Sequence, residues 1–271
     1  MSDGWREAGI TYAPIGISGW IRALLRGVTL AVVTFGSLAV LLLVRLIERP
    51  LFGQNRPITP YITQFVCKMA FVIMGIGLIV RGTAMTGRGA VVANHGSWLD
   101  IFALNAALRV YFVSKSEVAS WPGIGWLARA TGTVFIARKS ADAKRQQVQF
   151  EARLRVGHRL LFFPEGTSTD TLRILPFKPT LFAAFYTHGL EHVLKMQPVR
   201  VIYHPPKGAD PRFYGWWADM DFASHFLQVL AAAQQASVEV MLHPPLAIED
   251  FPGRKALAQA CEDVIKGTPS I

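Results

Sequence analysis

From about residue 81 onward, short apolar runs alternate with longer segments in which apolar positions follow helical spacing. The short runs predict strands at 89–93, 110–113, 133–136, 159–163, 199–203 and 237–242. The longer segments predict helices at 98–108, 124–131, 141–156, 180–188, 223–235 and 254–266. Strands that alternate with helices are typical of an α/β fold, so we expect a mostly parallel sheet flanked by helices.

The first 80 residues have a different pattern. Residues 27–44 form a run of eighteen without a charge, bounded on each side by arginines, which is just long enough to span a bilayer core. A second apolar run, 69–80, holds only twelve residues and predicts an interfacial or re-entrant helix. We therefore expect residues 1–80 to form an N-terminal two-helix membrane anchor and residues 81–271 to form the α/β domain. A pair of long core helices is the alternative.

Composition and charge agree with a membrane setting. Half of the residues are hydrophobic, only 17% are charged, and the net charge is +10. Seven lysines and arginines fall between Arg138 and Arg159, and a basic stretch of this kind binds nucleic acid, anionic lipid or an acidic protein. No nucleic-acid motif accompanies it, so we expect no nucleic-acid partner. The two cysteines stand far apart and the pair His188 and His192 has no third ligand, so no disulfide framework and no metal site are expected.

The first candidate for chemistry follows the apolar run 90–93. His95 comes directly after that predicted strand, and Asp100 lies five residues further on, about one turn into the next predicted helix. Histidine accepts and returns protons near neutrality, and a carboxylate on its far nitrogen orients the ring. No Gly-x-Ser-x-Gly elbow is present, and Ser97 lies only two residues from His95. The pair is therefore expected to activate a hydroxyl on a bound substrate, while a strand-end histidine bonded to backbone is the plain alternative.

A second polar cluster follows the predicted strand 159–163. Glu165 stands between proline and glycine, where a plain turn more often carries Asn or Asp. Gly166 lets backbone approach a ligand closely, and Thr167 and Ser168 supply hydroxyls. Because ligands of open α/β sheets bind at the carboxyl ends of the strands, the two clusters predict one site. Arg138 follows the predicted strand 133–136 and is expected at the same edge, where its guanidinium can hold a phosphate.

These segments resemble the signature blocks of the glycerolipid acyltransferase family. Residues 94–100 (NHGSWLD) and 163–168 (FPEGTS) are similar to its first and third blocks, and 132–138 (GTVFIAR) is similar to the second. Residues 197–202 (QPVRVI) match the fourth block only loosely. The similarity covers about residues 60–205, and three ordered blocks make it specific.

The resemblance implies a site. His95 and Asp100 would be catalytic, and the residues implied in substrate binding are Ser97, Lys115, Arg138, Glu165, Gly166, Thr167, Ser168 and Lys178. It also implies a thioester donor, acyl carrier protein or coenzyme A, with no cofactor. An acidic acyl carrier protein would dock on the basic stretch 138–159. The catalytic domain would then face the cytoplasm from the inner membrane.

Four functions remain open at this stage. The enzyme would move a fatty acyl group to the free hydroxyl of a lysolipid, most naturally 1-acylglycerol-3-phosphate, giving phosphatidate. The acceptor would otherwise be a lyso-ornithine lipid or a related lyso-aminolipid. The third alternative is a membrane lipid-binding protein without activity. A fourth, a hydrolase that uses water in place of the lipid alcohol, has less support.

Overall fold

The computed structural model describes residues 4–7, 9–136, 143–187 and 189–267. The helices are α1 (Gly4–Glu7), α2 (Ile17–Phe52), α3 (Thr59–Met74), α4 (Leu99–Ala107), α5 (Ile124–Thr131), α6 (Ala143–Arg155), α7 (Phe222–Ala231) and α8 (Arg254–Lys266). The strands are β1 (Gly77–Gly82), β2 (Gly89–Ala93), β3 (Tyr111–Lys115), β4 (Val134–Ile136), β5 (Leu160–Phe162), β6 (Lys195–His204), β7 (Ser237–Leu242) and β8 (Leu246–Ala247). Short 3-10 turns occupy 116–120, 179–186, 190–192 and 248–250.

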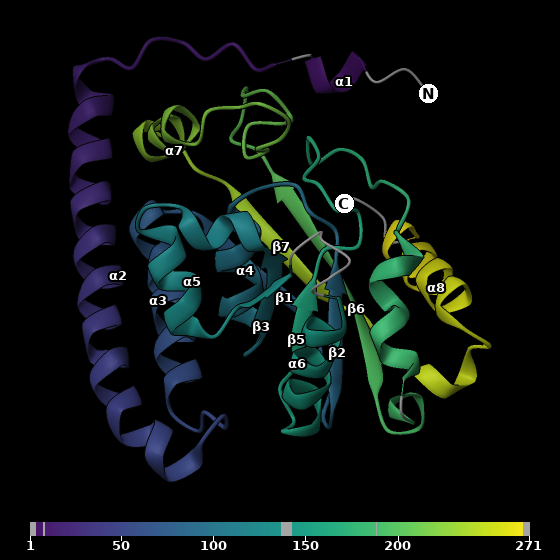
Figure 1. Ribbon diagram of the computed structural model, residues 1–271. Coiled ribbons are helices and arrows are strands. Elements are labelled where there is room, and N and C mark those ends of the chain that lie inside the picture. Colours follow the sequence, from purple (N-terminus) through teal and green to yellow (C-terminus); the bar gives the residue numbers. More distant parts are fainter. Residues whose placement is uncertain (1–3, 8, 137–142, 188, 268–271) are drawn as a thin grey trace.

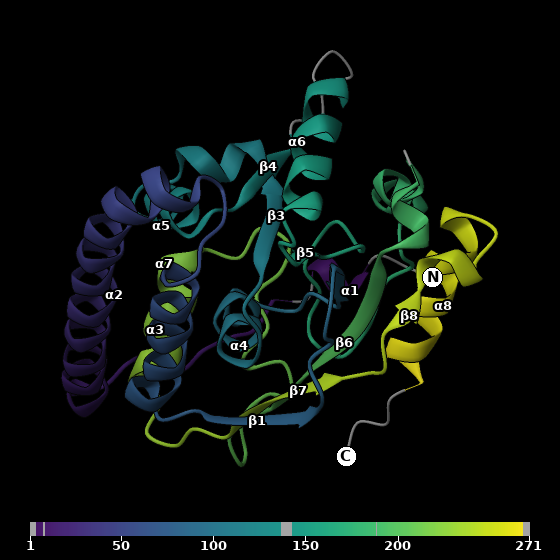
Figure 2. The ribbon, with the colours of Figure 1, turned by 90° about the horizontal axis from the view of Figure 1, so that it is seen from below.

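The strands form one mixed sheet in the order β1-β7-β6-β2-β5-β3-β4, with β8 beside β6. Strands β6, β2, β5, β3 and β4 run parallel, and only β7 and β8 pair antiparallel with β6. Side chains alternate across the sheet: Val91 and Leu161 pack into one core cluster, while Val92 and Phe162 pack into the other. Helices flank both faces (Figures 1 and 2), so the expected α/β fold with a mostly parallel sheet is confirmed.

The N-terminal region contains one long helix and one shorter one. Helix α2 runs for 36 residues and packs on α3, α7 and α5, at the outer side of the molecule (Figure 1). Glu48 joins α2 to α3, because its buried carboxylate accepts the N–H groups of Ile58 and Thr59, at 2.7 and 3.2 Å, and the Thr59 hydroxyl. These donors belong to the first turn of α3, so the side chain of Glu48 fixes how the hairpin closes.

The second helix predicted for the membrane anchor, over residues 69–80, is wrong in its bounds. Residues 69–80 are not one apolar helix, because α3 ends at Met74 and residues 77–82 form strand β1 beside β7. The reversal occurs at Gly75, which has a left-handed φ of 75° and returns its N–H to the carbonyl groups of Phe71 and Val72. The proposed division at residue 80 therefore falls inside β1, and the division itself stays a prediction.

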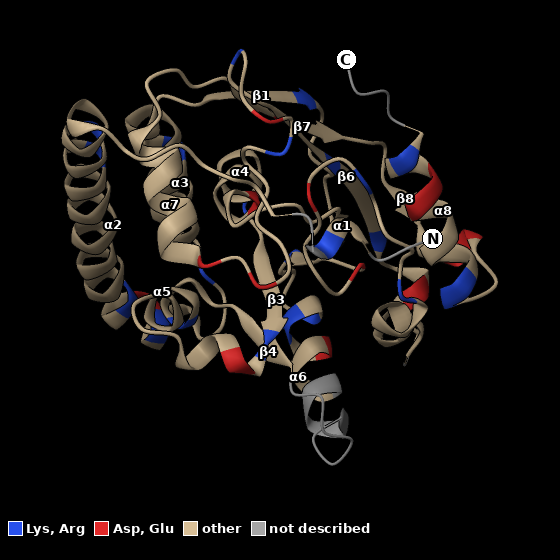
Figure 3. Cartoon of the chain, turned by 90° about the horizontal axis from the view of Figure 1, so that it is seen from above, with Lys and Arg blue, Asp and Glu red and all other residues tan. Residues whose placement is uncertain are grey.

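The outer face of α2 is apolar and uncovered. Within the described residues it is the one helix long and apolar enough to cross a membrane, and only 11% of its most apolar stretch is buried. Leu24, Val32, Leu43 and Leu46 are each more than 60% exposed. Charged residues are almost confined to the ends of α2 (Figure 3). Helix α2 suggests membrane association.

Two arginines near the N-terminal end of α2 form hydrogen bonds with the end of α7. Arg22 donates to the carbonyl of Ala231, and Arg26 donates to the carbonyls of Leu230 and Ala232, at 2.8–2.9 Å. These carbonyls end α7, where a helix carries unsatisfied acceptors and partial negative charge. Helix α2 is thus bonded to the end of α7.

Candidate active site

The site begins where β2 leaves the sheet. Asn94, the first residue after β2, bonds β6 on both sides of its amide: its Nδ2 donates to the Val201 carbonyl at 2.9 Å, and its Oδ1 accepts the Val201 N–H at 2.7 Å. This clamp ends the strand and places His95 at the carboxyl edge of the sheet. Asp100 lies in the first turn of α4, which starts four residues later.

Asp100 collects four donors and is fully buried. Its Oδ2 accepts the backbone N–H groups of Gly96 and Ser97, at 2.9 and 3.0 Å, and faces His95 Nδ1 at 2.7 Å. Because that oxygen already accepts two N–H groups, the Nδ1 of His95 is the protonated, donating nitrogen. The lone pair of Nε2 is therefore available as a base, and the described residues place no partner on it.

Tyr203 supplies the fourth donor. Its hydroxyl, at the carboxyl end of β6, donates to Asp100 Oδ1. Burial and the facing carboxylate raise the pKa of Tyr203 well above its usual value, so this group is a phenol throughout the physiological range. Sequence spacing does not reveal the role of Tyr203, because the contact joins residues 103 apart in the chain.

Further contacts fix both the ring and the backbone of His95. Phe163 stacks on it, with ring centroids 4.0 Å apart and an interplanar angle of 11°. The carbonyl of His95 accepts both the N–H and the hydroxyl of Thr169, at 2.8 and 3.1 Å. The His95 side chain stays 20% exposed, so a substrate can reach it.

Glu165 links the two signature blocks. Its Oε1 accepts the N–H of His95 at 2.7 Å and its Oε2 accepts the N–H of Leu175 at 2.6 Å, and its side chain is buried. Burial raises the pKa of Glu165 to about 8, against the lowering effect of these two amides. The carboxyl group thus positions the backbone of His95, and its direct contact with an acceptor remains a prediction.

Lys178 lies against Gly166, as a site at this edge requires. Gly166 has a φ of 74°, and a Cβ there would lie 2.6 Å from the Lys178 Nζ. The Lys178 N–H also donates to the Pro164 carbonyl at 2.9 Å. Thr167 and Ser168 follow in the same turn and are half-buried. Only glycine gives the lysine this room and accepts this backbone conformation.

The remaining predicted residues differ in position. Lys115 ends β3 at the same edge and is exposed. Ser97 is fully buried, and its hydroxyl accepts the Leu99 N–H at 3.3 Å, so it supports the start of α4. Arg138 and His188 lie outside the described residues. In the described part of the chain, no group of three or more His, Cys, Asp or Glu is placed to hold a metal ion.

Trp98 is part of the support of the site. It is 7% exposed, and its indole N–H donates to His225 Nδ1 at 2.9 Å. His225 Nε2 therefore carries the proton and donates to the Phe213 carbonyl at 3.1 Å. Burial lowers the pKa of His225 to about 4, so its ring stays neutral. Trp98 and Phe112 are core residues, whereas Trp126 is 63% exposed.

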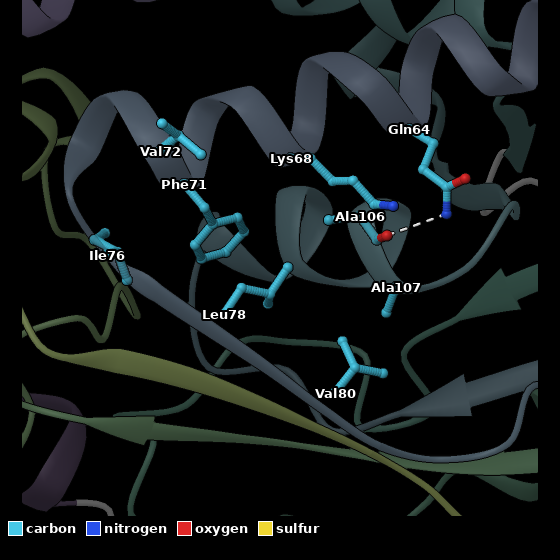
Figure 4. Close-up of a pocket in the computed structure, with 9 residues that line it drawn as sticks. All are labelled: Gln64, Lys68, Phe71, Val72, Ile76, Leu78, Val80, Ala106 and Ala107. Carbon is cyan, nitrogen blue, oxygen red and sulfur yellow. Dashed lines mark hydrogen bonds between the residues drawn. The ribbon is translucent and has the colours of Figure 1, made fainter.

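A groove of about 560 Å³ lies away from this chemistry. It opens between α3, β1 and the end of α4, lined by apolar side chains together with Gln64 and Lys68 (Figure 4). His95 is not among its lining residues. The candidate site therefore rests on geometry rather than on cavity size, because the hydrogen-bonded His95 and Asp100 pair lies at the strand edge.

Comparison with known proteins agrees with this geometry. A family model described as Acyltransferase matches residues 79–201. The chain is 59% identical to a lyso-ornithine lipid O-acyltransferase of Rhodobacter capsulatus over 253 residues, which cover 93% of this chain and 92% of that protein. The chain belongs to the acyltransferase family. The acyltransferase is also 40% identical to a 1-acyl-sn-glycerol-3-phosphate acyltransferase of Neisseria gonorrhoeae, over 45% of this chain and 49% of that protein.

A solved structure shares the fold. The 1-acyl-sn-glycerophosphate acyltransferase PlsC of Thermotoga maritima superposes with a TM-score of 0.65 at 21% identity, covering 93% of the acyltransferase and 94% of that chain. At this identity the likeness concerns the fold. The expectation that the chain is an enzyme of the acyltransferase type is confirmed by the family and by its relatives.

Proposed function

We propose that this acyltransferase transfers a fatty acyl group to the hydroxyl of a lyso-ornithine lipid. The observation that carries the proposal is the similarity to the Rhodobacter capsulatus enzyme of that name, which extends over nearly the whole of both chains. The motif blocks alone favour lysolipid acceptors in general. The full-length similarity supports the aminolipid acceptor over the others.

In the proposed reaction His95 acts as the general base. Its Nε2 removes the proton from the acceptor hydroxyl as the oxygen attacks the thioester carbonyl. The bond between carbon and sulfur then breaks, and the thiolate takes the proton from the imidazolium, so that an ester and a free thiol result. Asp100 holds the ring through Nδ1 and stabilises the transient positive charge, a contribution of roughly 10²–10⁴-fold in rate.

The proposed donor is a thioester of acyl carrier protein or coenzyme A, with no cofactor. Arg138, Lys115, Lys178, Gly166, Thr167 and Ser168 are the proposed substrate contacts, supported by their place in the blocks. The basic stretch 138–159 remains the proposed docking face. Within it, Arg153 is already engaged, since it donates to His158 Nδ1 and to the Gly132 carbonyl.

We further infer that α2 lies within one leaflet rather than across the bilayer. At 1.5 Å per residue its 36 residues extend about 54 Å, against a hydrocarbon core of about 30 Å. Its inner side packs on α3 and α7, so a spanning α2 would draw these elements into the membrane. An in-plane helix exposes only its apolar outer side to lipid. We propose the cytoplasmic face of the inner membrane, where thioester donors are found.

Purified enzyme with labelled acyl donor would test the acceptor. We expect incorporation of label into ornithine lipid from the lyso form, with a kcat/KM well above that for 1-acylglycerol-3-phosphate. The Neisseria gonorrhoeae relative makes the phosphate acceptor the second candidate. Preference for 1-acylglycerol-3-phosphate would replace our proposal by that activity, and formation of neither product by the wild-type protein would point to a lipid-binding protein.

Membrane attachment has its own test. Membranes that contain the protein are washed with high salt and then with alkaline carbonate, and the protein should require detergent for release. Release by salt alone would mean that charge, not the apolar face of α2, holds the protein.

A further inference from the structure

Two ion pairs stand at the mouth of the site. Arg173 binds Asp170, with Nε at 2.9 and 3.1 Å from the two carboxylate oxygens and Nη2 at 2.8 Å from Oδ2. Arg212 binds Asp210 in the same way, with Nε at 3.0 Å and Nη2 at 2.8 Å. We call these residues the mouth cluster (Asp170, Arg173, Asp210 and Arg212). Each arginine is neutralised by its own aspartate.

The Asp170 pair adjoins the catalytic histidine. Thr169, directly before it, is bonded to the His95 carbonyl. Thr171, directly after it, touches Gly96: a Cβ on Gly96 would lie 2.9 Å from the Thr171 Cγ2. The loop that carries the second pair reaches the same residue, because the Trp216 N–H donates to the Gly96 carbonyl at 2.9 Å. Both pairs therefore belong to loops that are bonded to the residues around His95.

The N-terminal segment joins the two pairs. Residues 9–16 run from α2 across the carboxyl edge of the sheet to α1 (Figures 1 and 3). The guanidinium of Arg173 lies over the ring of Trp5 in α1, 4.8 Å from its centroid. The indole of Trp217 donates to the Trp5 carbonyl at 3.3 Å and itself lies 5.6 Å from the Arg212 guanidinium. Trp5 thus connects the loop of Arg173 to the loop of Arg212.

Unused polar groups mark this place as built for a ligand. The Tyr12 hydroxyl and the Thr171 hydroxyl are both buried, and neither has a hydrogen-bond partner in the described structure. The Tyr12 ring packs edge-on against Phe213, the residue after Arg212, with ring centroids 6.2 Å apart. Thr171 also holds a φ of 71°, a left-handed conformation that a β-branched residue rarely adopts. Strain and unsatisfied groups together are typical of binding sites.

The mouth cluster retains one hydrogen-bond donor group and one acceptor position for a ligand. Asp170 occupies Nε and Nη2 of Arg173, so Nη1 remains for a ligand, and the Arg173 side chain is 41% exposed. Asp210 accepts three N–H groups, all from Arg212, and a carboxylate has about four acceptor positions. Its side chain is 29% exposed. Arg173 thus presents a cationic group and Asp210 an anionic group, on the two loops that Trp5 connects.

We propose that the mouth cluster binds the zwitterionic headgroup of the acceptor, with Arg173 contacting its carboxylate and Asp210 contacting its side-chain ammonium. The inference rests on the proposed function, because an ornithine headgroup carries these two charges. A phosphate monoester has about −1.5 to −2 charge, so a cluster without net charge gives it no net attraction, and it has no cationic group for Asp210. Asp170 is a positioning residue, since it is buried and holds the fork of Arg173.

Acceptor analogues with single charges removed would test this assignment. The kinetics compare lyso-ornithine lipid with its N-acetylated form, which lacks the ammonium, and its methyl ester, which lacks the carboxylate. We expect wild-type KM to rise about ten-fold or more for each analogue. Asp210→Asn should raise KM for the parent to the level of the acetylated form while retaining discrimination against the ester. Arg173→Gln should raise KM for the parent to the level of the methyl ester while retaining discrimination against the acetylated form. In both variants kcat should change little.

Matched variants separate headgroup recognition from folding. Asp210→Glu keeps the charge and should restore the preference for the ammonium. Asp263→Asn and Arg254→Gln, on the exposed side of α8, should keep both preferences. The proposal is overturned if Asp210→Asn and Arg173→Gln discriminate among the analogues as wild type does, or if both lose all preferences equally. Failure of the wild-type enzyme to acylate lyso-ornithine lipid at all would instead reject the proposed function.

Discussion

The carboxyl group of Glu165 makes the stability of the protein depend on pH in a defined direction. Its pKa is about 8 in the folded chain and near 4.5 when solvated. Between these values the folded protein binds the proton and the unfolded chain does not. Stability therefore falls as the pH rises from about 4.5 to about 8.

Two buried histidines set the lower limit of the pH range in which the effect of Glu165 on stability can be measured alone. Burial lowers the pKa of His158 and of His225 to about 4, from 6.5. Between pH 4 and 6.5 these two histidines are protonated in the unfolded chain but not in the folded protein. They therefore make the stability rise with pH up to about 6.5. Above 6.5 Glu165 acts without this opposition. At about 1.4 kcal/mol per pH unit, the loss between pH 6.5 and 8 is about 2 kcal/mol.

Thermal unfolding of the detergent-solubilised protein at pH 6.5 and pH 8 measures this loss. For a chain of this size, 2 kcal/mol corresponds to a fall in Tm of about 4–8 °C. Glu165→Gln removes the titrating group, so its Tm should be lower at pH 6.5 but nearly equal at the two pH values. Glu262→Gln is the control, because Glu262 accepts the Phe177 N–H but also pairs with Lys266. An unchanged pH dependence in Glu165→Gln would refute the reasoning.

The other predictions concern catalysis and the anchor. His95→Ala should lower kcat by at least about 100-fold without unfolding the protein, and turnover above a tenth of wild type would exclude a general base. Tyr203→Phe should lower kcat about ten-fold at constant KM, since it removes one donor to the carboxylate that orients His95; an equal change in KM would indicate a substrate contact instead. Arg138→Ala should raise the acceptor KM more than the donor KM, and equal effects would indicate a structural arginine. Arg26→Ala should lower stability by about 1–2 kcal/mol in thermal unfolding, because two carbonyls at the end of α7 lose their donor.

The apolar runs were sufficient to predict the central strands. Each run is short, β-branched or aromatic, and bounded by turn residues, so periodicity and length agree there. The register then explains why His95 and Glu165 meet: Val92 pairs with Phe162, so the residues after β2 and β5 emerge next to one another. Proximity at a strand edge follows from topology, which the alternation of elements already indicated.

Hydrophobicity alone could not separate a helix from a strand in residues 69–80. The segment is apolar throughout, and only Gly75, with its left-handed backbone, divides α3 from β1. The same limit applies to long-range partners. Tyr203 and Trp5 touch the site or its mouth from more than 100 residues away, and no local spacing records such contacts.

Helix α2 and the proposed catalytic pair, His95 and Asp100, are joined by a short series of contacts. Arg26 of α2 bonds the end of α7, His225 within α7 accepts the indole N–H of Trp98, and α4, which carries Asp100, begins at the next residue. Each contact is buried or half-buried, so the position of α2 fixes that of His95. An acceptor held in the leaflet presents its hydroxyl at one depth, set by the boundary between headgroup and acyl chain. If α2 lies in that leaflet, the same series of contacts sets the depth of His95 Nε2, and the enzyme needs no large movement to bring base and hydroxyl together.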